Sequence, residues 1–178
     1  MIRTALSCLV VVNLMSAIFS DNGTAGEPHT FRSDAGRFSI DFPAPSPSTR
    51  TLTGDKFLFT DYNIRHTVEV GDAEFAVEIH DVPRAADALL PSRYILEKSK
   101  AGLLEDMEAR EVNSRAIDRE GHPGRAVAFE IPERSLTGNL LIVLAKNRLY
   151  LVTVLHPEQE DPPMSYTFFF ESFEFWLE

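Results

Sequence analysis

Strict alternation of apolar and polar residues predicts the first strand of this chain. Between residues 37 and 42, Phe38, Ile40 and Phe42 fall on one face, polar residues fall on the other, and Pro43 follows. A period of two residues is typical of a strand with one buried face. Similar alternation, or many β-branched and aromatic residues, predicts further strands over 57–70, 75–82, 110–118, 126–131, 140–145 and 149–155.

Short polar interruptions predict how these strands connect. Gly71-Asp72 predicts a hairpin between the second and third strands, because such residues suit a tight turn. Lys146 to Arg148 predicts another hairpin, between the last two strands. Those two strands are apolar on both faces, so we expect them to lie in the middle of a sheet. The polar strand over 110–118 is expected at an edge.

Two segments predict helices. Residues 90–107 carry apolar residues at a ragged helical spacing, and Pro91 suits a first turn. Residues 164–171 predict a closing helix, although their phenylalanines also suit a strand. Three prolines between residues 43 and 47 predict an extended or turning segment.

Together these elements predict an α+β fold. Antiparallel hairpins with few helices are typical of a sheet flanked by helices, here an α/β/α sandwich. A length of 178 residues fits a single domain. If both faces of the central strands are buried, the helices over 90–107 and 164–171 are the available covers.

The first 25 residues predict a secretory signal peptide. Arg3 supplies a positive charge, and residues 4–20 contain no charged side chain. A basic start, an apolar middle and small residues before a polar stretch are the three parts of such a signal. The cleavage site is predicted between residues 17 and 26, and the sequence leaves its exact position open.

An uncleaved membrane anchor is the alternative reading of this segment. A spanning helix needs about 20 mainly apolar residues, whereas Asn13 and Ser16 interrupt a shorter run here. We therefore expect no stable membrane span after signal removal. After the signal we expect a linker over 26–35 and then a domain over 36–178. The expected location is the periplasm or the exterior of a bacterial cell.

The cysteine content and the net charge argue against several classes of function. The only cysteine is Cys8, inside the predicted signal, so the mature chain is expected to lack disulfides and thiol catalysis. The formal charge is −10. Phosphate contacts need a basic footprint, so we expect no nucleic-acid partner.

Three segments together resemble one known superfamily. They are Gly36–Pro43 near the start, Asn147–Val154 in the late hairpin and Phe169–Phe173 near the end. Their order is similar to that of the PsbP-like α/β/α sandwich, which occurs in photosystem II extrinsic proteins and in exported bacterial proteins. The resemblance spans residues 31–176. Because that superfamily has no shared catalytic residues, it implies a non-catalytic binding or assembly role.

A few residues could carry chemistry. His66 and His80 lie on strands that the first hairpin would pair, and Glu78 lies near them, so a metal site is conceivable. Such a site needs three or four converging ligands, and this spacing matches no compact motif. Histidines on a polar sheet face are the alternative. We predict no catalytic residue, no metal and no cofactor, and the sequence has no Gly-x-Ser-x-Gly nucleophile motif.

Aromatic residues crowd the C-terminal end. This segment holds more aromatic residues than one face of a short element can carry, so most should be core: Tyr166, Phe168, Phe169, Phe170, Phe173, Phe175 and Trp176. The candidates for an exposed patch are Tyr166, Phe169, Phe173 and Trp176. Any that remain exposed would form a patch for a partner or a ligand.

The sequence leads to one main hypothesis about function and two alternatives. The main hypothesis is an exported, non-catalytic binding or assembly module that acts through a protein partner in the cell envelope. The first alternative is a small-ligand or lipid carrier, with an apolar cavity of about 300 Å³ or more between the sheet and the C-terminal helix. The second alternative is an enzyme of unknown class.

Overall fold

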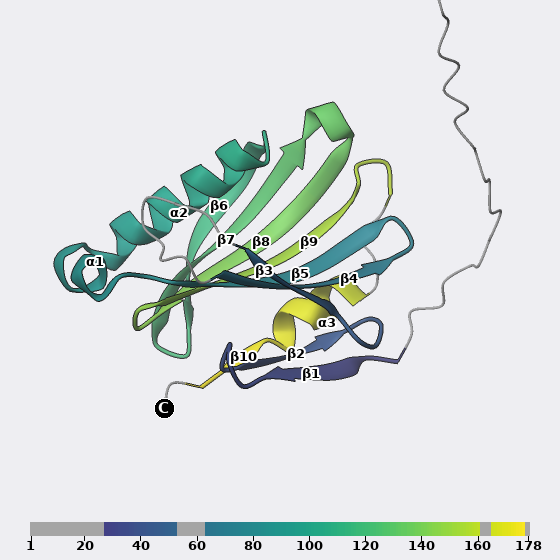
Figure 1. The fold of residues 1–178 in the computed structure, drawn as a ribbon. Coiled ribbons are helices and arrows are strands. Elements are labelled where there is room, and N and C mark those ends of the chain that lie inside the picture. Colours follow the sequence, from purple (N-terminus) through teal and green to yellow (C-terminus); the bar gives the residue numbers. More distant parts are fainter. Residues whose placement is uncertain (1–26, 53–62, 161–164, 177–178) are drawn as a thin grey trace, which may run out of the picture.

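The structure is a computed structural model that describes residues 27–52, 63–160 and 165–176. Within these residues, a small antiparallel sheet and the C-terminal helix lie on one face of a large antiparallel sheet, and two further helices lie on its other face (Figure 1). The large sheet has the strand order β3 (Ser48–Leu52), β4 (Asn63–Val70), β5 (Ala73–Asp81), β9 (Arg148–Pro157), β8 (Leu136–Ala145), β7 (His122–Ile131), β6 (Arg110–Arg119). The small sheet has the order β1 (His29–Ser33), β2 (Phe38–Phe42), β10 (Glu174–Phe175). The helices are α1 (Arg84–Leu89), α2 (Ser92–Asp106), α3 (Ser165–Glu171) and a 3₁₀ turn, Pro132–Arg134.

The layers lie on both faces of the large sheet. Helices α1 and α2 lie over one face, and α3 with the small sheet lies over the other (Figure 1). The predicted α+β fold, a mainly antiparallel sheet flanked by helices in one domain, is thereby confirmed.

Strand β9 illustrates why both faces are covered. Tyr150 and Val152 are buried in the core on the side of the small sheet, whereas Leu149 and Leu151 are buried in the core beneath α2. Successive side chains of a strand point to opposite faces, so an apolar run needs two covers. Strands β9 and β8 are neighbours in the interior of the sheet, as their composition predicts.

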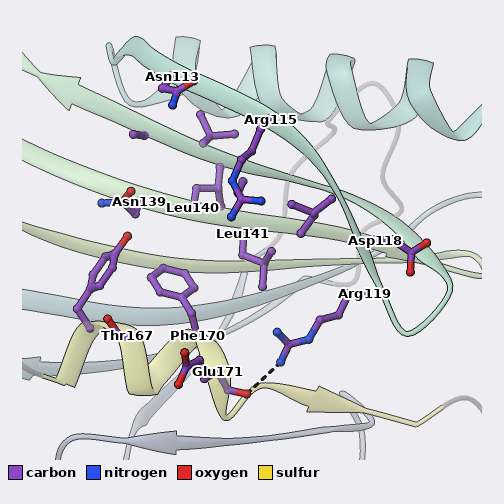
Figure 2. A pocket seen from close by; sticks show the side chains of 15 residues that line it. Asn113, Arg115, Asp118, Arg119, Asn139, Leu140, Leu141, Thr167, Phe170 and Glu171 are labelled. Carbon is purple, nitrogen blue, oxygen red and sulfur yellow. Dashed lines mark hydrogen bonds between the residues drawn. The ribbon is translucent and has the colours of Figure 1, made fainter.

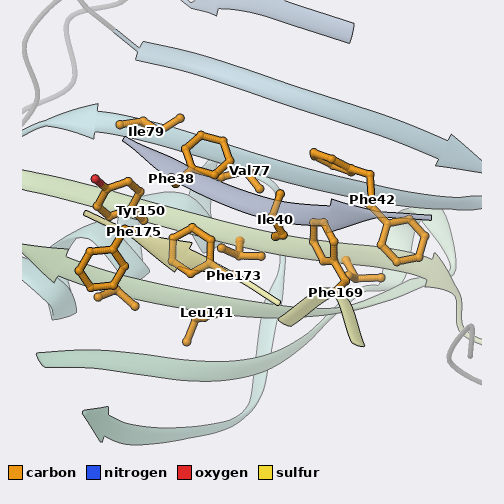
Figure 3. Close-up of a cluster of buried hydrophobic side chains, with 14 of the residues drawn as sticks. Phe38, Ile40, Phe42, Val77, Ile79, Leu141, Tyr150, Phe169, Phe173 and Phe175 are labelled. Carbon is orange, nitrogen blue, oxygen red and sulfur yellow. The ribbon is translucent and has the colours of Figure 1, made fainter. Parts of the chain in front are cut away.

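The core beneath the small sheet is rich in phenylalanine (Figure 3). Phe42 and Phe169 lie with ring centroids 5.3 Å apart, and Phe75 meets Phe169 edge-on at 5.2 Å. Tilted and edge-on ring pairs of this kind add about 1 kcal/mol beyond the burial of their area. The Phe169 ring therefore anchors α3 in this core.

Helix α2 packs on the opposite face. Its Ile95 and Leu104 are buried in a core that includes Phe129 of β7. At the edge of this contact the carboxylate of Glu97 pairs with the guanidinium of Arg125 on β7. The apolar stripe supplies most of the docking free energy, because a half-exposed ion pair adds little.

Several elements differ from the sequence predictions. Residues 26–35 were expected to be a linker, but they contain β1, in which Phe31 pairs with Ile40 of β2. The proline-rich region is followed by β3, a strand that pairs with β4. Helix α1 precedes the predicted helix as a separate short element. Short or polar elements like these form because neighbouring strands and helices stabilise them, which local patterns do not reveal.

Two predicted segments lie wholly or partly outside the described residues. The predicted signal peptide, residues 1–25, lies wholly outside them. The first half of the predicted strand over 57–70 also lies outside them, since β4 begins at Asn63. Within the described ranges, no helix is both long enough and apolar enough to cross a membrane.

Candidate functional site

A groove lies between α3 and the β6–β8 part of the large sheet. Its volume is about 590 Å³. Figure 2 shows side chains of the sheet facing α3 across this space. The groove is open rather than enclosed, so a ligand could enter it without movement of the backbone.

The register of three strands builds the floor of this groove. Ala126 of β7 pairs with Arg115 of β6 on one side and with Leu141 of β8 on the other. Ala128 lies between Asn113 and Asn139 in the same way, and all of these residues line the groove. Cross-strand partners share a face of a sheet. Two alanine methyl groups in the middle strand therefore leave space that larger side chains would fill.

The positive charges in the groove differ in their partners. Arg119 donates hydrogen bonds to the carbonyl oxygens of Glu171 and Phe173, at 3.1 and 2.5 Å, and so ties β6 to the end of α3. Arg115 makes no hydrogen bond or ion pair with any residue in the described part of the chain. Its guanidinium extends from β6 into the groove, toward Phe170 (Figure 2). Arg115 is therefore available to a ligand.

The wall formed by α3 is aromatic. The rings of Tyr166 and Phe170 lie 5.1 Å apart in an edge-on arrangement, and both line the groove. The Tyr166 hydroxyl, whose ordinary pKa is 10.0, is protonated at neutral pH and can donate a hydrogen bond, and burial raises this pKa further.

The aromatic residues singled out from the sequence have different positions. Phe169 and Phe173 are fully buried in the core, in line with the expectation that most of the cluster is core. Tyr166 lines the groove, and Trp176 is half-buried with the Arg32 guanidinium 3.9 Å from its ring centroid. The four rings therefore do not form one surface patch.

The metal candidates lie on two faces of the sheet. His66 pairs with Val77 in the β4–β5 register, so its ring faces the small sheet, where it lies 4.6 Å from the Phe31 ring. Glu78 and His80 face the other way, and their side chains meet at 3.0 Å. The structure thus brings Glu78 and His80 together and leaves His66 apart. In the described ranges, no three His, Cys, Asp or Glu residues converge as metal ligands.

Glu78 belongs to a charged network instead. Arg65 of β4 pairs with the carboxylates of both Glu74 and Glu78 on β5. Burial alone would raise the pKa of Glu78, but the hydrogen bond from His80 and the charge of Arg65 outweigh it and lower the pKa. Glu78 is therefore ionised at neutral pH and held between two partners, which is a structural role.

His66 is expected to make the protein less stable in mild acid. Burial lowers its pKa in the folded protein, whereas the unfolded chain has the ordinary value near 6.5. As the pH falls through that value, the unfolded state takes up a proton that the folded state does not, so stability decreases. Urea unfolding at about pH 7.5 and about pH 5.5 measures this loss. The loss should be smaller in His66→Gln, and an equal loss in both proteins would contradict the assignment.

A second hollow, of about 680 Å³, lies beside the β4–β5 turn and the end of β9. It is lined by carboxylates at Glu69, Asp72, Glu74, Glu158 and Glu160. These side chains make that end of the molecule acidic, but they do not converge on one point.

Comparison with known structures supports the fold. The chain is similar to cyanobacterial PsbP (CyanoP) from Synechocystis sp. PCC 6803, with a TM-score of 0.60 and 12% identity over 96% of this chain and 98% of that chain. The fold is therefore PsbP-like, which confirms the resemblance seen in the sequence. No protein-family model matches the chain, and no curated protein is significantly similar to it.

Two other solved structures are more distant. One is a protein of unknown function from Pseudomonas aeruginosa, with 12% identity, a TM-score of 0.36 and coverage of 74% of this chain and 84% of that chain. The other is from Bacteroides thetaiotaomicron, with 13% identity, a TM-score of 0.41 and coverage of 87% and 50%. Similarity at this level says nothing further about the protein.

Proposed function

We propose that the protein is an exported, non-catalytic binding protein and that the groove beneath α3 is its ligand site. The observation that supports this most strongly is the 590 Å³ groove itself. Pockets for small ligands commonly measure about 300–1,000 Å³ and combine an apolar lining with a few polar groups. This groove combines alanines, aliphatic side chains and aromatic rings with two asparagines, two arginines and two acidic residues.

Export rests on the N-terminal sequence. Arg3 followed by the uncharged residues 4–20 is the pattern of a secretory signal. A ligand site in an exported protein would serve uptake, transfer or sensing in the cell envelope. The groove matches the position that a carrier would use, between the sheet and the C-terminal helix.

A protein partner in the envelope is the second candidate. Strand β6 is at the edge of the large sheet, and Val112 on it is 55% exposed. An edge strand presents unpaired backbone groups to which another chain can add a strand. Other residues of β6, among them Asn113 and Arg115, line the groove, so a partner bound at β6 could also control access to a ligand.

Filling the groove is expected to abolish ligand binding. Ala128→Trp places an indole ring in the middle of the floor, where the described structure has only a methyl group. The protein is purified from its native envelope, and native mass spectrometry measures bound small molecules. Wild-type protein should carry an added mass that the Ala128→Trp protein lacks.

Ala101→Trp is the matched control, because Ala101 is exposed on α2 over the opposite face of the sheet. This variant should retain the ligand, and thermal melts should show both variants folded. An added mass that persists in folded Ala128→Trp protein would exclude the groove. Capture of a protein in place of a small molecule would favour the β6 partner.

A further inference from the structure

We propose that the groove binds a small organic carboxylate with an apolar body, and that Arg115 binds the carboxylate group. This inference rests on the proposed function, because it names the ligand class for the same groove. It depends on the uncommitted charge of Arg115, the polar groups around it and the apolar surfaces beside it.

The charge of Arg115 sets the sign of the ligand. Two arginines and two acidic residues line the groove, which is formally neutral. Arg119, however, is committed to backbone carbonyls at the end of α3. Asp118 accepts a hydrogen bond from the Gly121 amide at 2.8 Å and lies at the far end of the groove (Figure 2). The Glu171 carboxylate also lines the groove, from the end of α3. Arg115 is thus the groove cation without a partner among the described residues.

One guanidinium matches one carboxylate. The planar fork of an arginine donates two parallel hydrogen bonds to a carboxylate, and such bidentate pairs are among the stronger interactions in proteins. Nucleotides and other polyphosphates carry several charges and usually bind to several cations or a helix N-terminus. A cationic ligand would be repelled by Arg115. A monoanion is the best match for this groove.

Neutral donors can complete the anion site. Asn113 and Asn139 lie on either side of Ala128, and their side-chain amides can donate hydrogen bonds. Tyr166 adds a hydroxyl donor from the α3 wall. An anion held by one charged and several neutral donors needs no second cation.

The remaining lining favours an apolar body. Ile117, Leu141 and Phe170 also line the groove and present hydrocarbon surface to a ligand. Burial of such surface contributes about 25 cal/mol per Å². A carboxylate attached to a medium-length alkyl chain or an aromatic ring would use both parts of the groove.

Isothermal titration calorimetry with decanoate and with decanol tests this proposal. The two probes share an alkyl chain and differ in charge. Wild-type protein should bind decanoate more tightly than decanol. Arg115→Gln should weaken decanoate binding about tenfold or more, the effect of losing a charged hydrogen-bond partner, and should leave decanol binding unchanged. Arg84→Gln is the control, because Arg84 is exposed on α1 over the other face of the sheet.

The outcomes separate the two proposals. Loss of decanoate binding in Arg115→Gln, but not in Arg84→Gln, supports the carboxylate site. If decanoate and decanol bind equally and both are blocked by Ala128→Trp, the groove binds ligands but the role of Arg115 is wrong. If neither probe binds wild-type protein, the carboxylate proposal is overturned. The groove would then remain a site for another ligand if native mass spectrometry shows an added mass on wild-type protein that the Ala128→Trp protein lacks.

Discussion

Replacing Phe173 with alanine is expected to lower the free energy of unfolding by about 3–5 kcal/mol, the usual effect of removing a buried phenylalanine ring. The Phe173 side chain is fully buried. Its ring centroid lies 5.6 Å from that of Tyr150 and 6.0 Å from that of Phe38. This ring joins the small sheet to the large sheet, so its loss leaves a cavity at the contact between them. Urea unfolding followed by tryptophan fluorescence measures the change.

Phe168→Ala is the matched control for this prediction. Phe168 lies on α3 only a few residues away, but its side chain is 41% exposed. Its replacement should change the free energy of unfolding by about 0.5 kcal/mol or less, as expected for an exposed position. Equal effects of the two substitutions would show that the core beneath the small sheet is not packed as described.

Removing the Arg65 charge is expected to produce the second large effect. Arg65→Gln leaves the buried carboxylate of Glu78 with His80 alone, and leaves Glu74 without its cation. Removing one partner of a buried ion pair typically lowers the free energy of unfolding by about 3–5 kcal/mol. Because Glu74 is partly exposed, we expect a loss at the lower end of this range, about 3 kcal/mol. Chemical unfolding at neutral pH measures this loss.

The pH dependence of the same variant provides an independent check. In wild-type protein the pKa of Glu78 is lowered on folding, because its partners outweigh the effect of burial. That stability is present above the ordinary pKa of a glutamate and is lost as the pH falls toward the lower, folded value. The acid-induced loss should be smaller in Arg65→Gln. The role assigned to the network is wrong if neutral-pH stability and acid sensitivity are both unchanged.

The strong periodic patterns in the sequence predicted the centre of the fold correctly. Phe38, Ile40 and Phe42 alternate, and this pattern places all three in the core. Gly71, with φ of 59°, makes the turn predicted between β4 and β5. These features are local, because alternation and turn chemistry depend on neighbouring residues alone.

The edges of the fold were harder to predict. Strands β1 and β3 are short and largely polar, and each forms because a partner strand offers backbone hydrogen bonds. The charged network required the register of β4 against β5, which puts Arg65 opposite Glu78 and turns His66 to the other face. A one-residue change in register would reverse that arrangement.

One signal in the sequence pointed to the groove. In the strand over 126–131, Ala126 and Ala128 alternate with the large residues Val127 and Phe129. Small residues along one face of a strand indicate space on that face. The walls of that space could not be predicted, since they come from β6, β8 and α3, which are distant in the sequence.

The claim that the groove beneath α3 is a binding site is tested most directly by nuclear magnetic resonance. Isotope-labelled protein is titrated with decanoate, and the backbone amide shifts are mapped onto the fold. We predict that the largest shifts fall on residues of β6, β7, β8 and α3 around Arg115 and Ala128. Shifts confined to α1 and α2, or to the acidic end beside the β4–β5 turn, would contradict the proposed site.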